Sequence, residues 1–157
     1  MRVMGIDPGT RVAGWGVVEK RGTRIVWIGH GVAKAKASLP FAERLLTIYN
    51  GLAQAIAEHS PVWIAIEGVF YGKSVQSAIK IGEGRGVALL CAAQSGASIA
   101  EYAPTVVKKA VVGTGGAQKA QVQEMVRVIL GLAELPSPAD ASDALALAIC
   151  HCHRHRG

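Results

Sequence analysis

The sequence contains 157 residues, of which 50% are hydrophobic and 18% are charged, and its formal net charge is +6 at pH 7. A chain of this size and composition fits one packed domain over residues 1–157 rather than a disordered segment, and its apolar runs stay below the ~18 residues that a membrane span needs. The positive charge favours an acidic partner, most commonly nucleic acid, although a generally basic soluble protein explains the charge alone equally well.

The first half of the chain alternates between extended and helical patterns. Tight turns at Pro8–Thr10 and Lys20–Gly22 separate three strand-like runs, which predicts an antiparallel meander. A stripe of apolar residues then recurs at helical spacing, and a continuous apolar run typical of a central strand follows it. The expected elements are strands at 2–7, 13–19 and 23–33, a helix at 40–58 and a strand at 62–67.

The second half of the chain is mainly helical. Ser74 is a candidate N-cap for a long helix, and prolines interrupt the chain at Pro104 and again at 136–138. The expected elements are helices at 74–95, 105–112, 122–130 and 138–152 and a short strand at 97–103. Strands and helices in this order predict an α/β fold in which helices cover both faces of a mixed sheet.

Four carboxylates stand where this fold would bring them together. Asp7 and Glu67 each close an apolar strand, and Asp140 and Asp143 lie three residues apart at the start of the last helix. Strand ends meet at the rim of an open α/β sheet, where such folds place their active sites, and a three-residue step puts both helical acids on one face. A local acidic cluster is unexpected as background in a chain of positive net charge.

Each acid also has a plain structural explanation. Asp7 precedes a Pro-Gly pair, which suits a turn, and Glu67 suits a solvated strand end. Ser137 and Asp140 have the spacing of a capping box, with a proline at the first helical position. Capping does not explain Asp143, which lies beyond the unpaired amides of the first turn. We favour an acidic site, because all four explanations would otherwise have to hold together.

Gathered carboxylates repel one another unless a cation neutralises them, and hard oxygen ligands suit Mg²⁺ or Mn²⁺. Two metal ions about 4 Å apart can activate a water and neutralise the departing oxygen of a phosphodiester. Asp7 is the best candidate for a shared ligand, because it would come from the central strand. The sequence therefore predicts metal-dependent phosphodiester hydrolysis, with two Mg²⁺ per site that Mn²⁺ can replace. The predicted catalytic metal ligands are Asp7, Glu67, Asp140 and Asp143.

Four segments carry a family resemblance. They are Gly5-Ile6-Asp7-Pro8-Gly9-Thr10, Ile66-Glu67-Gly68-Val69-Phe70, Val111-Val112-Gly113-Thr114-Gly115 and Ala139-Asp140-Ala141-Ser142-Asp143-Ala144-Leu145-Ala146. In this combination the chain closely resembles, nearly from end to end, the RuvC Holliday-junction resolvases of the ribonuclease H-like superfamily. The resemblance implies a ribonuclease H-like five-stranded sheet, with three antiparallel strands followed by parallel additions. In that family the four matched acids are the metal ligands.

The resemblance also implies a function and partners. It implies a structure-selective DNA endonuclease, active as a homodimer, that resolves four-way junctions in recombination and repair. Paired symmetric nicks would leave ligatable 5′-phosphate and 3′-hydroxyl ends, because a twofold enzyme meets a pseudo-twofold substrate. The family further implies partnership with a RuvA–RuvB branch-migration complex.

Two aromatic residues are candidates for DNA contact. Phe70 matches the family's aromatic that stacks on an unpaired base, and Tyr71 beside it would widen that platform. Both lie between Gly68 and Gly72 in a chain with few aromatics, which favours this role over a place in the core.

Four lysines are further candidates. Lys108 and Lys119 resemble the family's DNA-contacting positions, and Lys73 and Lys109 would assist them. Exposed lysines are often only solvated charge, so these assignments depend on the resemblance.

Two other motifs suggest different sites. The run Gly82-Glu83-Gly84-Arg85-Gly86 fits a nucleotide loop, but it falls inside a predicted helix, which the resemblance places at the dimer interface. The run Cys150-His151-Cys152-His153, followed by His155, suggests a zinc site without a second ligand cluster, and histidines also suit a helix C-terminus. Three cysteines without framework spacing favour a reducing compartment, and Asp7-Pro8-Gly9 interrupts any signal-peptide core, so we expect a cytoplasmic protein.

Three alternative functions compete with junction resolution. A different ribonuclease H-like nuclease would cut RNA or RNA–DNA hybrids. A fragment of an actin-like ATPase or kinase would need two duplicated domains, and the chain shows no second copy. A junction-binding protein without catalysis would not need four acids.

Overall fold

The computed structural model describes residues 1–68 and 74–156. A five-stranded sheet forms the middle of the molecule, in the order β3-β2-β1-β4-β5. Antiparallel pairing joins β1 to β2 and β2 to β3, whereas β4 adds parallel to β1 and β5 parallel to β4. The strands are β1 (Arg2–Asp7), β2 (Val12–Arg21), β3 (Arg24–Lys34), β4 (Trp63–Glu67) and β5 (Ser98–Tyr102). This arrangement confirms the predicted mixed sheet and places β1 at its centre.

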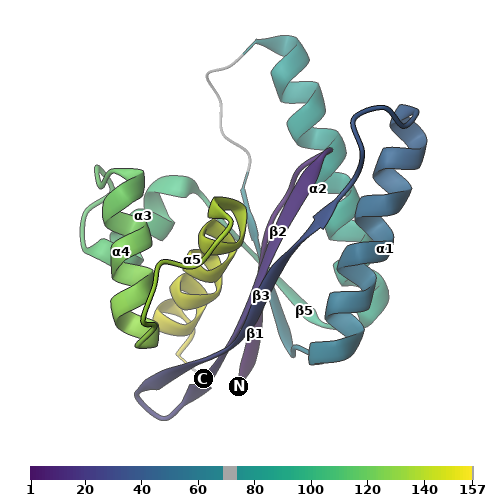
Figure 1. Ribbon diagram of the computed structural model, residues 1–157. Helices are drawn as coiled ribbons and strands as arrows, with labels where there is room; N and C mark the ends of the chain where they lie inside the picture. The colour runs from purple at the N-terminus through teal and green to yellow at the C-terminus, as the bar shows by residue number, and fades with distance from the viewer. Residues whose placement is uncertain (69–73, 157) are drawn as a thin grey trace.

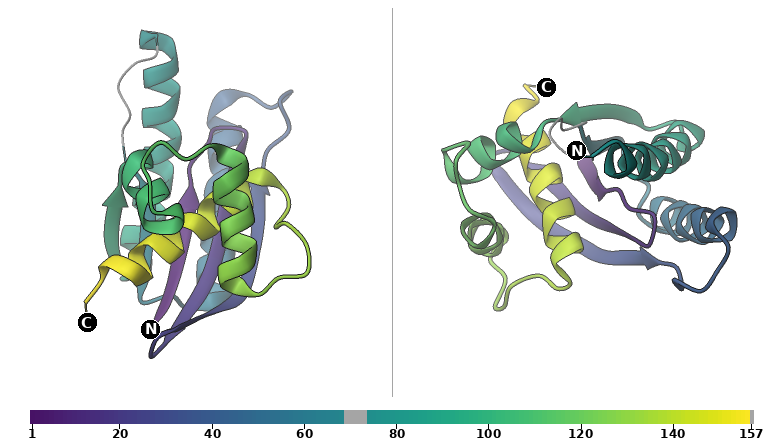
Figure 2. Two further views of the ribbon diagram at one scale, coloured as in Figure 1. Left: turned by 90° about the vertical axis from the view of Figure 1, so that its left-hand side faces the viewer. Right: turned by 90° about the horizontal axis from the view of Figure 1, so that it is seen from above.

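Helices cover both faces of the sheet (Figures 1 and 2). One face carries α1 (Phe41–His59) and α2 (Val75–Ser95), and the other carries α3 (Pro104–Val112), α4 (Lys119–Leu130) and α5 (Ala139–Arg154). Successive strand residues point to opposite faces, so Val3 joins the core under α5 while Met4 joins the core under α1 and α2. Among the helices of the described residues, none combines the length and apolar character needed to cross a membrane.

The predicted elements are all present, with boundaries that differ by a few residues. The helix caps were predicted less well. Ser74 is the N-cap of α2, as predicted, and its side chain accepts a hydrogen bond from the amide of Ser77. The capping box predicted at Ser137 is wrong, because α5 begins after Pro138 and has no side-chain cap bond. A capping box that we did not predict, between Gln118 and its third following residue, starts α4 earlier than the apolar stripe indicated.

Helix α5 lies directly on β1 and β2 because glycines face it. A Cβ atom at Gly5 would overlap the carbonyl oxygen of Ala144, and one at Gly14 would overlap the carbonyl oxygen of Asp140. Gly14 is also the residue that pairs with Asp7 across the two strands. The close approach therefore sets the first turn of α5 beside the end of β1.

This close packing gives a test of the fold. Gly5→Ala should lower the free energy of unfolding by about 3 kcal/mol or more, because a backbone carbonyl occupies the space that the methyl group needs. Gly116→Ala is the matched control: a Cβ there meets only the Thr114 hydroxyl at 3.8 Å, so stability should change by less than about 1 kcal/mol. Urea denaturation measures both, and equal effects would contradict the packing of α5 against β1.

Candidate active site

Asp7, Glu67 and Asp143 line one pocket of about 260 Å³. Asp7 ends β1 and Glu67 ends β4, and the residues before them, Ile6 and Ile66, are partners in the parallel ladder. The two carboxylates therefore follow neighbouring strands at the same edge of the sheet. Asp143 reaches the pocket from α5, the helix that packs on the sheet face to which Val3 and Ala65 point.

Asp140 lies beside this pocket rather than in its wall. It sits one turn before Asp143 on α5, and its charge contributes to raising the pKa of both Asp7 and Asp143. The four predicted acids therefore form one electrostatic cluster, in which three line the pocket and the fourth stands at its edge.

The cluster makes ionisation of the acids unfavourable. Burial, followed by the charges of Glu67, Asp143 and Asp140, raises the pKa of Asp7 from 3.8 to about 8, and the charge of Lys119 opposes this. Burial also raises the pKa of Asp143, although its contact with the same lysine partly offsets the effect. A bound cation would favour the ionised forms and lower these pKa values.

Lys119 supplies a positive charge inside the cluster. Its Nζ lies 3.2 Å from Oδ2 of Asp143, and the charge of that carboxylate is the main reason that the pKa of Lys119 is raised. The lysine is the first residue of α4, and 63% of its side chain is exposed. The ammonium group is therefore a neutralising contact that solvent can reach.

The donor atoms fit a hard divalent cation. The acids offer only carboxylate oxygens, which Mg²⁺ and Mn²⁺ prefer, and they need a cation to be ionised together near neutral pH. Within residues 1–68 and 74–156, no three His, Cys, Asp or Glu side chains already converge on one ion position. The fit thus rests on the chemistry of the donors and on the raised pKa values of Asp7 and Asp143.

The predicted DNA-binding residues divide into three groups. Lys108 and Lys119 lie in the wall of the acidic pocket, whereas Lys109 is exposed and does not line it. The remaining candidates, Phe70, Tyr71 and Lys73, lie outside the described residues.

Sequence reasoning missed one residue close to the site. Arg85 donates from Nε to the backbone carbonyl oxygen of Glu67 at 3.2 Å. The glycine-rich run around it drew attention to the glycines, and no spacing rule marked the arginine between them.

The histidines and cysteines of the C-terminal helix serve packing. His151 is buried, its Nδ1 shares a 2.8 Å hydrogen bond with the hydroxyl of Tyr102, and its ring lies 4.6 Å from that of Trp63. Nδ1 of His153 lies 2.9 Å from the carbonyl oxygen of Ala110. The zinc interpretation gains no support among the residues that the structure describes.

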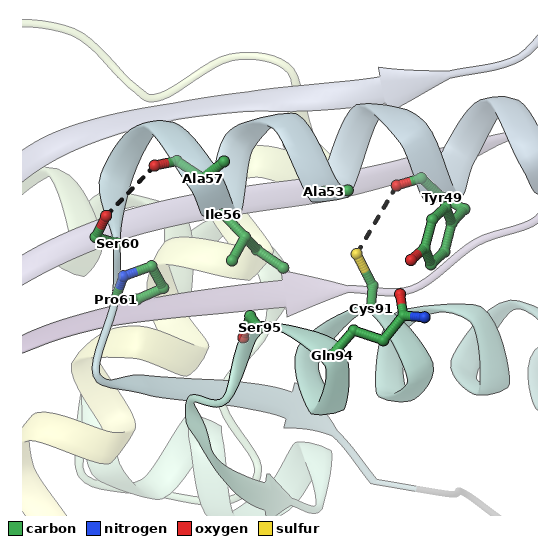
Figure 3. Close-up of a pocket in the computed structure, with 9 residues that line it drawn as sticks. All are labelled: Tyr49, Ala53, Ile56, Ala57, Ser60, Pro61, Cys91, Gln94 and Ser95. Carbon is green, nitrogen blue, oxygen red and sulfur yellow. Dashed lines mark hydrogen bonds between the residues drawn. The ribbon is translucent and has the colours of Figure 1, made fainter.

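A larger hollow of about 370 Å³ lies between α1 and α2 (Figure 3). Tyr49, Cys91 and Gln94 are among its nine lining residues, and none of the nine is acidic or basic. Size alone does not mark it as the catalytic pocket, because Asp7, Glu67 and Asp143 line the smaller one.

Comparisons with known proteins identify the family to which the chain belongs. The family model described as "Crossover junction endodeoxyribonuclease RuvC" matches residues 3–151. A protein of that name from Chloroflexus aggregans is 52% identical over 143 residues, which cover 91% of this chain and 87% of the relative. The Thermus thermophilus RuvC structure is 36% identical, with a TM-score of 0.87 over 98% of this chain and 94% of that one. The same Thermus protein in complex with a Holliday junction substrate gives a TM-score of 0.89 at 36% identity, over 96% of this chain and 92% of that one.

The raised pKa of Asp7 gives a test without substrate. In the metal-free protein the unfolded state ionises Asp7 near pH 4, but the folded state keeps the proton up to about pH 8. Folding therefore binds a proton in this window, and stability should fall as the pH rises, by at most about 1.4 kcal/mol per pH unit.

Melting curves in EDTA between pH 4 and 8 measure this effect. Asp7→Asn should flatten the decline and should exceed the wild type in stability near pH 8. The exposed Glu134, as Glu134→Gln, is the charge-matched control and should follow the wild-type curve. Parallel curves for the wild type and Asp7→Asn would show that the carboxyl group ionises normally.

Proposed function

The chain belongs to the RuvC family of crossover junction endodeoxyribonucleases, and we propose that the acidic pocket at the ends of β1 and β4 is its active site. As a member of this family it is an endodeoxyribonuclease that resolves Holliday junctions. One observation supports the site above others: the acids closing two neighbouring parallel strands meet an acid of α5, where burial and then the charges of the other acids raise the pKa of Asp7 to about 8. The nuclease would be a single domain over residues 1–157, because one sheet carries both cores.

We infer that the pocket holds two Mg²⁺ ions and that Mn²⁺ can replace them. When bound, such ions neutralise the phosphodiester and supply a nucleophilic water. Asp7 comes from the central strand and is best placed to be shared, with Glu67, Asp140 and Asp143 as flanking ligands. A separate side chain acting as general base is not required, because a bound metal lowers the pKa of water.

The lysines of the pocket would bind the DNA backbone. Lys108 and Lys119 line the same hollow as the acids, so a phosphate approaching the carboxylates meets both ammonium groups. If Asp143 held a cation, the ammonium of Lys119, which now contacts that carboxylate, would be available to a phosphate. Lys73 and Lys109 would add weaker contacts outside the pocket, each of which makes affinity more dependent on salt.

We infer a homodimer that meets through α2. Apolar side chains are exposed along one stripe of this helix, at Val75, Ile79 and Leu90, and a Cβ at Gly82 or Gly86 would meet nothing within 4 Å. A second copy packed there would bury this stripe and present one pocket to each half of a four-way junction. We infer from the family that the RuvA–RuvB complex is a partner. The three free cysteines support a reducing compartment, and we propose the cytoplasm as the location.

Two of the alternative functions considered from the sequence can be compared with junction resolution. The family model that matches residues 3–151 is that of a crossover junction endodeoxyribonuclease, which favours this function over an actin-like ATPase. A hybrid nuclease remains separable by experiment, because preferential cutting of an RNA–DNA hybrid over a mobile junction in Mg²⁺ would reverse the assignment.

The site assignment predicts that cleavage and binding separate. Asp7→Asn or Asp143→Asn should lower junction cleavage by about a thousandfold or more, because a lost ligand removes several kcal/mol of charge stabilisation in the transition state. Junction affinity should change little, because the basic contacts remain. Cleavage and gel-shift assays on a synthetic junction measure both, with Glu134→Gln as the control. Cleavage at the wild-type rate by either variant would disprove the assignment.

The resemblance also predicts a role for Phe70 in opening the junction centre. Phe70→Ala should reduce cleavage more than binding, because stacking on an unpaired base is worth about 1–3 kcal/mol and offsets the cost of unstacking it. Phe41→Ala, at the start of α1, removes the chain's other phenylalanine and should leave the ratio of cleavage to binding unchanged. Equal losses of cleavage and binding in Phe70→Ala would mean that this residue only helps to hold DNA.

A further inference from the structure

Helix α2 touches the chain beside both strand-end acids, from the face of the sheet opposite α5 (Figure 1). Gly84 packs against Gly9, two residues after Asp7, so closely that a Cβ at Gly84 would lie 3.0 Å from the carbonyl carbon of Gly9. The next residue, Arg85, donates its Nε hydrogen bond to the backbone carbonyl oxygen of Glu67 at 3.2 Å. One turn of α2 therefore contacts the segments that carry two of the acids.

Arg85 is itself held in place by β5. Its Nη2 lies 2.6 Å from Oε1 of Glu101, and its side chain is only 15% exposed. The residue after Glu101 is Tyr102, which pairs with Glu67 in the ladder and accepts a 2.8 Å hydrogen bond from the amide of Gly68. A single guanidinium group thus joins the helix, the end of β4 and the neighbouring strand.

We propose that Arg85 is a positioning residue that fixes the end of β4 and thereby the place of the Glu67 carboxylate relative to Asp7. The inference rests on the proposed metal-dependent cleavage by these acids. Groups that orient ligating carboxylates strongly affect metal affinity, since small displacements of a ligand weaken coordination. Lysine would replace the arginine poorly, because its ammonium group lacks the rigid planar fork that holds separate nitrogens on the carbonyl of Glu67 and the carboxylate of Glu101.

Neither stability nor DNA contact accounts for this arginine. Its acidic partner, Glu101, is 48% exposed, and ion pairs with exposed partners add little to stability. Arg85 itself is largely buried, and two of its nitrogens already have protein acceptors, so it does not offer a free cation to a phosphate.

Binding of Mn²⁺ without DNA tests the proposal directly. In Arg85→Lys the dissociation constant for Mn²⁺, measured by electron paramagnetic resonance of the free ion, should rise about tenfold. In Glu101→Gln the rise should be smaller, because Arg85 keeps its bond to the Glu67 carbonyl and loses only the group that orients it. Junction cleavage by Arg85→Lys should fall at low Mn²⁺ and recover at high Mn²⁺, which a general loss of structure would not allow.

Variants of the same helix provide the controls. Lys80→Gln removes an exposed positive charge from α2 and should bind Mn²⁺ like the wild type. Gly84→Ala, which pushes on Gly9, should weaken Mn²⁺ binding.

The outcomes separate this inference from the site assignment. Unchanged Mn²⁺ affinity in a folded Arg85→Lys, while Asp7→Asn abolishes cleavage, would overturn the role of Arg85 and leave the active site standing. If Arg85→Lys fails to fold, Glu101→Gln decides, and an unchanged affinity there overturns the inference. Loss of affinity in Lys80→Gln equal to that in Arg85→Lys would also overturn it, since a change on α2 away from Glu67 would then have the same effect.

Discussion

The close approach of α5 to β1 and β2 is the constraint on which the site depends. The helix backbone occupies the space where side chains of Gly5 and Gly14 would stand, so the helix cannot slide or lift without losing this contact. Because Gly14 faces Asp140 and pairs with Asp7, the contact that packs the core also fixes the distance between acids far apart in sequence. The glycines cost strand propensity, and the buried face of α5 offsets that cost.

The cluster assembled in this way is unfavourable by itself. Ionising Asp7 beside three other acids is opposed both by burial and by repulsion, which the raised pKa expresses. Lys119 relieves part of the repulsion through its contact with Asp143, but its exposed side chain can leave. The fold therefore tolerates a poorly neutralised site. A cation that binds there relieves the repulsion between the acids, and this relief adds to its binding free energy and to the stability of the folded protein. Such local cost is typical of functional sites.

Local patterns in the sequence were enough to predict the order of the strands and helices and to select the four acids as neighbours. Apolar runs that end in an acid mark Asp7 and Glu67, and a three-residue step on a helix relates Asp140 to Asp143. Features that depend on contacts between elements far apart in the sequence could not be predicted. Gly14 weakens a strand when judged locally, and only the helix above it explains its presence. Arg85 carries no spacing signal, because its two acceptors come from different strands. The start of α4 was also missed, since glutamines rather than the usual Ser or Thr and Glu form its capping box.

The two faces of the sheet make different contributions to the proposed site. The face under α5 supplies the carboxylates, whereas the face under α2 supplies contacts that hold their backbones, through Gly84 and Arg85. The outer stripe of α2 is also the apolar surface proposed for a second subunit. A partner that orders this helix would then order the end of β4, and the free-energy coupling must be reciprocal. Metal binding that draws Glu67 into place would in turn favour association of the subunits. A resolvase built in this way would bind metal more tightly as a dimer than as a single subunit, which suits an enzyme whose single nick would leave a junction unresolved.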